Sequence, residues 1–147
     1  GMPYEKAGAF IEEYFQDFAE VRIWQDRLID KARQTGYVEN LNGRKRWLPN
    51  IAAYNAWEAG EARRAAINMP IQGLAADIIK LAMIGVKKAM PDLRLILSIH
   101  DELVFEVADD MLKEVSERVK EIMETVYKLD VPLKVDMVTG KNWAEIS

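Results

Sequence analysis

The clearest hydrophobic pattern in the chain lies at residues 93–107, where two short apolar runs flank three ionisable residues. Runs of this length, rich in leucine and β-branched residues, are typical of buried strands. The pattern therefore predicts a hairpin with His100, Asp101 and Glu102 at its turn. Charges beside an apolar core are costly unless they are solvated, paired or bound to a cation. The turn is thus either a solvated connection between two strands, or a rigid site whose carboxylates bind a metal or stabilise charge that develops during a reaction.

A helical repeat of apolar residues covers the first segment, 1–36. The repeat is carried by Phe10, Ile11, Tyr14, Phe15 and Phe18, and then by Val21, Trp24, Leu28 and Ala32. Side chains at this spacing share one helix face, and we expect the aromatic ones to be core rather than a base-stacking surface. Gly36 is the expected end of the helical segment, and a bend is expected near Asp17–Glu20.

A short hairpin is predicted over 37–48, because Asn42-Gly43 separates two short strands. Asn-Gly is the strongest short hairpin signal, since both residues of such a turn need positive φ, and we expect this conformation at both. The second strand carries three consecutive cations and an aromatic residue, Arg44, Lys45, Arg46 and Trp47. Cations on a protruding hairpin suit a phosphate backbone, and the aromatic ring adds a stacking surface. Charge also protects a solvated edge strand, so both interpretations stay open at this point.

The longest helical pattern covers 52–90 and contains Pro70. Proline removes a backbone donor and clashes one turn back, so we expect a kinked helix or a break at 68–70. Polar residues recur at every fourth position, namely at Arg64, Asn68 and Gln72. On a continuous helix they form one stripe that can reach phosphates, sugars or base edges. Spacing alone favours a solvated helix face.

The last segment, 109–138, is predicted to hold a helix and a final strand. Asp109 and Asp110 are the expected caps of the helix, which is expected to run to about Leu129. Apolar and polar residues then alternate over Val131–Val138, as in a half-buried strand. The complete order favours a single α+β domain, 1–147, with a mostly antiparallel sheet backed by long helices.

The chain has 147 residues, no cysteine, one histidine and a net charge of −4. Disulfides and thiolate metal sites are therefore excluded, and so is a histidine-rich zinc site. Hard cations bound by carboxylates remain open. Because the net charge gives no general attraction to nucleic acid, such binding needs a local basic patch. No apolar run approaches membrane-spanning length, so no membrane partner is expected.

Three stretches are distinctive as motifs: Gly36-Tyr37-Val38 leading to GRKR at 43–46, RAAINMPIQGLAADIIK at 64–80, and SIHDELVFEV at 98–107. In this order and spacing they resemble the C-terminal, palm-and-fingers part of family A DNA polymerases of the bacterial DNA polymerase I type. The ending VPLKVDMVTGKNW is also similar to that family's C-terminus, so the resemblance covers essentially the whole chain. The implied fold is part of a polymerase fold, with 93–107 as the catalytic-type hairpin.

The resemblance implies a DNA-directed DNA polymerase, a nucleotidyltransferase that extends a primer from deoxynucleoside triphosphates on a DNA template. It makes Asp101 the candidate ligand of two Mg²⁺ ions and a catalytic residue, with Glu102 beside it as a second catalytic carboxylate. His100 is implied as a contact of the primer terminus. The implied DNA-binding residues are Arg44, Arg46, Arg64, Asn68, Gln72 and His100. The implied location is the bacterial cytoplasm, in association with the nucleoid.

Other features of the family lie outside this sequence. The first catalytic aspartate, and the helix whose lysine, arginine and tyrosine bind the incoming nucleotide, correspond to positions upstream of the residues present. We therefore expect the chain to supply only part of the two-metal site, to be inactive alone and to need the upstream polymerase segment as a partner. Two positions depart from the family, because Arg63 replaces a common acidic residue and Ala59 a common arginine.

Two other functions stay open as alternatives. The first is a non-catalytic DNA-binding or assembly module derived from a polymerase, which would use the cationic residues but not Asp101. The second is a small metal-dependent hydrolase built on His100, Asp101 and Glu102, which needs further ligands that the sequence does not obviously provide. A polymerase piece in isolation is also expected to expose apolar surface near the first helix and the central hairpin, which favours a homo-oligomer.

Overall fold

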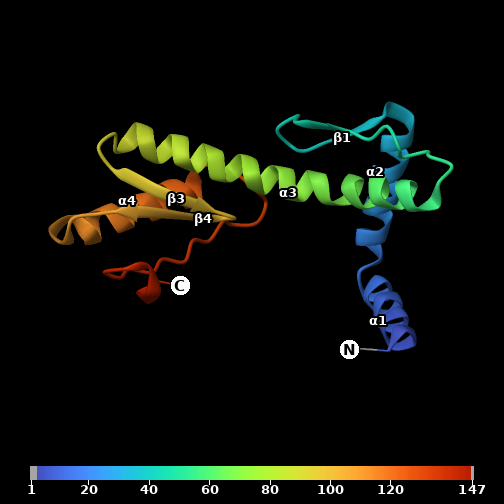
Figure 1. The fold of residues 1–147 in the computed structure, drawn as a ribbon, viewed down its shortest axis with the longest axis horizontal. Helices are drawn as coiled ribbons and strands as arrows, with labels where there is room; N and C mark the ends of the chain where they lie inside the picture. The colour runs from blue at the N-terminus through green and yellow to red at the C-terminus, as the bar shows by residue number, and fades with distance from the viewer. Residues whose placement is uncertain (1–2, 147) are drawn as a thin grey trace. The chain divides into compact units, whose positions relative to one another are not determined.

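The computed structural model describes residues 3–146, which divide into two compact units (Figure 1). The first unit extends to Leu74, and the second begins at Ala75. Helices and two small antiparallel hairpins make up these units, which confirms the predicted α+β class. The single domain stays a prediction, and within it the structure distinguishes the two units.

The first unit contains two helices, a hairpin and the beginning of a third helix. Its elements are α1 (Tyr4–Asp17), α2 (Ala19–Thr35), β1 (Tyr37–Glu39), β2 (Lys45–Trp47) and the first part of α3 (Ala56–Ala89). The expected bend is confirmed at Phe18, which separates α1 from α2 with φ −120° and ψ 53°. Gly36 ends α2 as predicted: its φ of 78° is left-handed, and its N–H donates to the Ala32 carbonyl at 2.8 Å.

The aromatic stripe of α1 does not form the core, so that prediction was wrong. Phe10 is 63% exposed and Phe18 is 54% exposed. The rings pack on one another instead, because the Tyr14 ring centroid lies 5.1 Å from that of Phe18 and 5.3 Å from that of Phe15. Helical spacing identifies an apolar face, but it does not identify the surface that covers it.

The core of the first unit brings α2, the hairpin and α3 together. Its buried members are Ala32, Val38, Leu48, Ile51, Ala62, Ala66 and Met69. Three of these seven are alanines, so the backbones approach closely without large side chains between them. The hairpin loop also lies against α3, since a Cβ added at Gly73 would be 3.6 Å from Asn40 Nδ2.

The first hairpin forms where it was predicted, but its turn differs. Among residues 3–146, Gly43 has a positive φ of 75°, whereas Asn42 does not, so the expectation of positive φ at both turn residues was wrong. The cause is Asn40, whose side-chain oxygen accepts the N–H groups of Asn42 and Arg44, each at 3.0 Å. The Gly43 N–H also donates to the Asn40 carbonyl at 2.9 Å. These bonds favour a longer loop closed by a left-handed glycine.

A salt bridge joins α2 to the hairpin: Lys31 Nζ donates to Glu39 Oε1 at 2.7 Å. This hydrogen bond, and then the charge attraction, lowers the pKa of Glu39 and raises the pKa of Lys31. A carboxyl whose pKa is lowered by folding stabilises the fold above its ordinary pKa, and this contribution is lost as the pH falls through the lowered value. The contribution of the lysine is lost only as the pH rises through its raised pKa.

We therefore expect the stabilisation by Glu39 to be present at neutral pH and to be lost in acid, as the pH falls below the ordinary pKa of a glutamate and through the lowered pKa of Glu39. Urea unfolding of the wild type and of Glu39→Gln, at pH 7 and at pH 3, measures it. The wild type should be slightly more stable at pH 7, and the difference should shrink at pH 3. The same difference at both pH values would contradict the assignment.

The second unit contains the rest of α3, a second hairpin and a further helix. Its remaining elements are β3 (Arg94–Ile99), β4 (Glu102–Glu106), a 3-10 turn (Asp109–Met111), α4 (Leu112–Thr125) and a second 3-10 turn (Trp143–Glu145). The hairpin predicted over 93–107 is thus confirmed. Its pairing shifts between Leu95 and Leu97, so Ile96 forms a bulge. Helices α3 and α4 meet at Gly85, where an added Cβ would be 3.0 Å from Ile122 Cγ2.

Helix α4 differs from its prediction at both ends. It ends at Thr125 rather than near Leu129, and the residue before it, Met111, makes no side-chain capping bond. Asp109 was expected to cap this helix. Its carboxylate instead accepts a hydrogen bond from Lys141 Nζ at 2.5 Å. Asp109 is therefore bonded to a lysine far along the chain rather than to the backbone N–H groups that begin the helix.

The strand predicted over Val131–Val138 is not found, because this segment has no regular secondary structure. The Val135 N–H donates to Glu124 Oε1 of α4 at 3.0 Å rather than to a neighbouring strand. Alternation of apolar and polar residues marks two faces, but a strand also needs a partner edge for its backbone groups. The second unit, as described, offers only the two strands of its hairpin.

Helix α3 continues through Pro70 from Ala56 to Ala89, so of the two predicted outcomes at 68–70 the break did not occur, and the kink stays a prediction. Proline inside a helix costs roughly 3 kcal/mol, through its missing donor and its steric clash. Burial of Ala66 and Met69 in the core fixes the turn before the proline and offsets this cost.

Length and composition alone would allow α3 to cross a membrane, since an 18-residue window has a mean hydropathy of 1.4. This finding differs from the expectation that no apolar run approaches that length. Of the same window, 22% is buried within the described residues. One such helix is a weak indication, because a helix that packs against other protein has the same composition.

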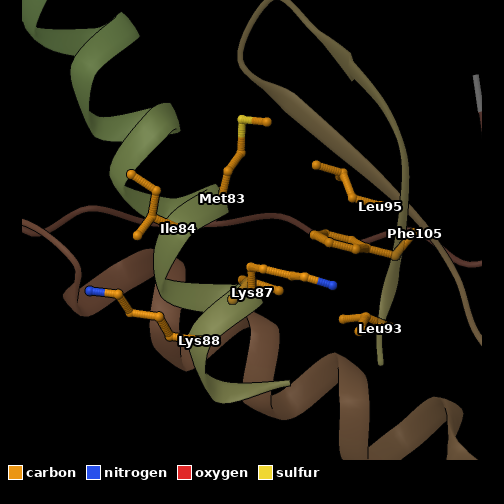
Figure 2. Close-up of a pocket in the computed structure, with 8 residues that line it drawn as sticks. Met83, Ile84, Lys87, Lys88, Leu93, Leu95 and Phe105 are labelled. Carbon is orange, nitrogen blue, oxygen red and sulfur yellow. The ribbon is translucent and has the colours of Figure 1, made fainter. Parts of the chain in front are cut away.

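An apolar pocket of about 340 Å³ lies beside the second hairpin (Figure 2). Met83 and Ile84 of α3 line one side, and Leu95 and Phe105 of the strands line the other. In Figure 2 the Phe105 ring points from β4 toward the helix. Lys87 at the same pocket donates to the Pro91 carbonyl. Side chains of α3 therefore support the hairpin from one face.

Candidate catalytic turn and nucleic-acid-binding residues

The polar triplet lies at the tip of the β3–β4 hairpin, as predicted. Ile99 pairs with Glu102, so His100 and Asp101 form a two-residue loop and Glu102 is the first residue of β4. Among the described residues, His100 is the single non-glycine residue with positive φ, at 53°. A two-residue hairpin loop needs positive φ at its first position. The tight turn therefore imposes this strained conformation on His100, and such strain is common at functional sites.

All three side chains of the triplet are exposed, while the strands behind them are partly buried. Cross-strand pairing of Leu97 with Val104, and of Ser98 with Leu103, continues directly up to the turn. The carboxylates are consequently held on short, paired strands and remain open to an incoming ion or substrate.

The carboxylates fit a hard cation, but only in part. Mg²⁺ usually keeps several waters and takes one or two protein carboxylates together with phosphate oxygens of a substrate. Asp101 and Glu102 supply that number. No group of three or more metal-ligating side chains occurs among residues 3–146, so a complete protein cage is not found there.

The predicted cationic and amide residues all lie in the first unit and are exposed. Arg44 ends the hairpin loop and Arg46 lies in β2. Arg64, Asn68 and Gln72 lie on α3, and because the helix is unbroken their spacing places them on one face. Arg64 forms an ion pair with Glu61, one turn earlier. The structure thus groups five predicted contacts in one unit and the acidic turn in the other.

Sequence reasoning missed Asn40, which is buried and organises the loop that ends at Arg44. The signal was present, because asparagine commonly bonds to the backbone two residues further along a turn. The Asn42-Gly43 pair alone was used to predict the loop. Asn40 therefore positions a predicted phosphate contact without being one.

Exposed carboxylates on a stiff turn suit hard cations, and arginine and amide side chains suit phosphates and bases. This combination is typical of proteins that process nucleotides or nucleic acids. The chain belongs to DNA polymerase family A, whose sequence profile matches residues 1–145. This match confirms the resemblance drawn from the three motifs.

Curated relatives agree with this assignment. The chain is 46% identical over 150 residues to the thermostable DNA polymerase I of Thermus filiformis, covering 99% of this chain and 18% of the relative. It is 44% identical over 144 residues to that of Thermus aquaticus (97% and 17%) and 40% identical over 149 residues to DNA polymerase I of Lactococcus lactis subsp. cremoris (99% and 17%). The chain therefore spans less than a fifth of the length of these bacterial relatives.

A solved structure is similar as well. It is the POL domain of Pol1 from M. smegmatis in complex with DNA primer-template and dNTP. The TM-score is 0.84 and the identity is 43%, over 90% of this chain and 24% of that chain. This similarity confirms that the chain has part of a polymerase fold.

Proposed function

We propose that this chain is the part of a DNA-directed DNA polymerase that carries Asp101 to the reacting phosphate. The observation behind the proposal is the two-residue turn, which holds an exposed aspartate on paired strands in a member of DNA polymerase family A. In a two-metal site, Mg²⁺ would activate the primer hydroxyl and stabilise the leaving pyrophosphate. Asp101 is the proposed ligand, and Glu102 is the proposed second catalytic carboxylate.

The proposed DNA contacts divide between two elements. Arg44 and Arg46 on the first hairpin approach primer phosphates, where guanidinium groups bind two oxygens at once. On α3, Arg64, Asn68 and Gln72 contact template and primer. His100 contacts the primer terminus, and its exposed ring beside Asp101 supports this role.

We further propose that the chain is inactive alone. Two carboxylates do not complete a two-metal site, and the relatives are more than five times as long as the segment that matches. The upstream polymerase segment would supply the remaining metal ligand and the nucleotide-binding residues. It would also pack against the exposed apolar face of α1. Without that segment the same apolar face favours a homo-oligomer, and the complete enzyme would act in the bacterial cytoplasm.

A complementation assay tests this function. The chain is mixed with a separately expressed upstream fragment of a related polymerase, and primer extension with Mg²⁺ and deoxynucleoside triphosphates is followed. Light scattering on the chain alone comes first, because self-association competes with the second polypeptide. We expect extension only when both polypeptides are present.

The alternative is a non-catalytic DNA-binding or assembly module, and the exposed cations of the first unit favour it as the second candidate. It predicts association with the upstream fragment and salt-dependent binding of primer-template, but no extension. Extension by the chain alone would contradict the proposed need for a partner.

A further inference from the structure

The two faces of the first hairpin carry different side chains. Alternation along β1 and β2 places Val38 and Arg46 on one face, and their backbones are paired. Val38 is fully buried, so this face is directed to the core of the first unit. The opposite face, here called the outer face, carries Tyr37, Glu39, Lys45 and Trp47. None of these four residues has a role in the proposed polymerase chemistry.

The outer face presents an aromatic surface to solvent. Tyr37 and Trp47 are cross-strand partners with ring centroids 5.1 Å apart and an interplanar angle of 61°. This edge-to-face contact fixes the orientation of the indole, yet Trp47 remains 67% exposed. A large ring that is both held in place and open to water can accept a flat partner with little loss of side-chain entropy.

The same face is positively charged around the rings. Lys45 Nζ lies 4.2 Å from the centroid of the Tyr37 ring, next to the aromatic pair. The acid opposite it, Glu39, is bound by Lys31 at 2.7 Å. Two lysines therefore lie near one carboxylate on this side of the hairpin. At the exposed rings, Lys31 and Lys45 outnumber the single carboxylate of Glu39, although the whole chain has a net charge of −4.

We propose that the outer face binds single-stranded DNA, with one unpaired base stacked on Trp47 and an adjacent phosphate held by Lys45. Exposed aromatics interleaved with cations are the combination that binds single strands without sequence preference. Bases inside a duplex are already stacked on both sides, so the surface selects an unpaired stretch. The proposal rests on the proposed polymerase function, which brings a template strand to the chain. It adds a contact outside the catalytic turn.

The test measures binding of the complete chain to a fluorescent oligothymidylate of about 12 nucleotides, without Mg²⁺. Trp47→Ala should weaken binding roughly 5- to 150-fold, because stacking on one aromatic ring has about that effect per base. Trp47→Phe should restore most of the affinity. Trp57→Ala is the matched control, since Trp57 is an equally exposed indole of the same unit, at 71%. This control should bind like the wild type.

Two further measurements separate stacking from charge. An abasic oligomer of the same length should bind the wild type as weakly as the normal oligomer binds Trp47→Ala. Lys45→Ala should reduce the slope of log affinity against log salt by about 0.7, the value for one phosphate contact to a single strand. Equal binding of the normal and abasic oligomers, or equal losses from Trp47→Ala and Trp57→Ala, would overturn the proposal.

Failure of this proposal is distinguishable from failure of the proposed function. If primer extension occurs but Trp47→Ala binds the oligomer like the wild type, the outer-face site is refuted and the polymerase assignment stays intact. Trp47-dependent binding without extension in the complementation assay would support the outer-face site and favour the non-catalytic module. Circular dichroism on each variant, together with the rescue by Trp47→Phe, identifies any loss that comes from unfolding.

Discussion

Replacing Asp101 by asparagine is expected to lower the rate of primer extension in the complemented polymerase roughly 10³-fold or more. Asparagine keeps the size of the side chain but loses the negative charge that a divalent cation needs. Asp101 is exposed in a two-residue loop, so the fold should not change. A gel-based extension time course at saturating DNA and nucleotide measures the effect.

Asp110→Asn is the matched control, because it removes an exposed carboxylate from the same unit, outside the turn. It should extend primers at the wild-type rate. Binding of primer-template by Asp101→Asn should stay within about twofold, since phosphate contacts rather than this aspartate determine affinity. Full activity of Asp101→Asn would refute its role as a metal ligand. Equal losses from both variants would indicate a general effect of charge instead.

Replacing Asn40 by alanine is expected to destabilise the first unit by about 1–3 kcal/mol. The side-chain oxygen of Asn40 accepts two backbone N–H groups, and the residue is 5% exposed. Alanine leaves those donors without an acceptor in a site that water reaches poorly. Because one donor belongs to Arg44, the variant should also weaken the binding of primer-template. Urea unfolding followed by circular dichroism measures the first effect, and fluorescence anisotropy measures the second.

Asn40→Asp and Asn42→Ala are the controls for this prediction. Aspartate keeps an oxygen acceptor at the same place and should lose less stability than alanine. Asn42 lies in the same loop with an exposed side chain, so its replacement should cost little. If Asn40→Ala unfolds at the same urea concentration as Asn42→Ala, the two hydrogen bonds are not what holds the loop.

Local signals predicted the elements that depend on local chemistry. Gly36 ended a helix because it takes a left-handed conformation. The apolar runs around His100 formed a hairpin because a short apolar run, a tight turn and a second run pair with each other. Predictions that depended on a distant surface were wrong. The aromatic face of α1 and the alternating segment Val131–Val138 both needed a partner that the described units do not supply.

The candidate site shows the same division. Residue types and motif spacing were enough to select Asp101, Glu102 and the cationic residues, and the family assignment was confirmed. Positions were harder to predict, because a loop conformation depends on single hydrogen bonds. The Asn42-Gly43 pair predicted a hairpin correctly but its turn wrongly, since one buried asparagine two residues earlier decided the geometry. Which face of the first hairpin lies on the core, and therefore that Trp47 lies on the solvent-exposed face, also required the structure.

The bulge at Ile96 has a consequence for how the length of this segment can vary. It separates the pairing of Leu95 with Phe105 from the pairing of Leu97 with Val104. A bulge accommodates one unpaired residue, here Ile96. Deletion of Ile96 would place the Leu95–Phe105 pair directly next to the Leu97–Val104 pair, as in a regular ladder. The three pairs nearest the turn would keep their partners. The loss of this one residue would therefore leave the spacing from Leu97 to Glu102, and with it the position of the acidic turn on the strands, unchanged.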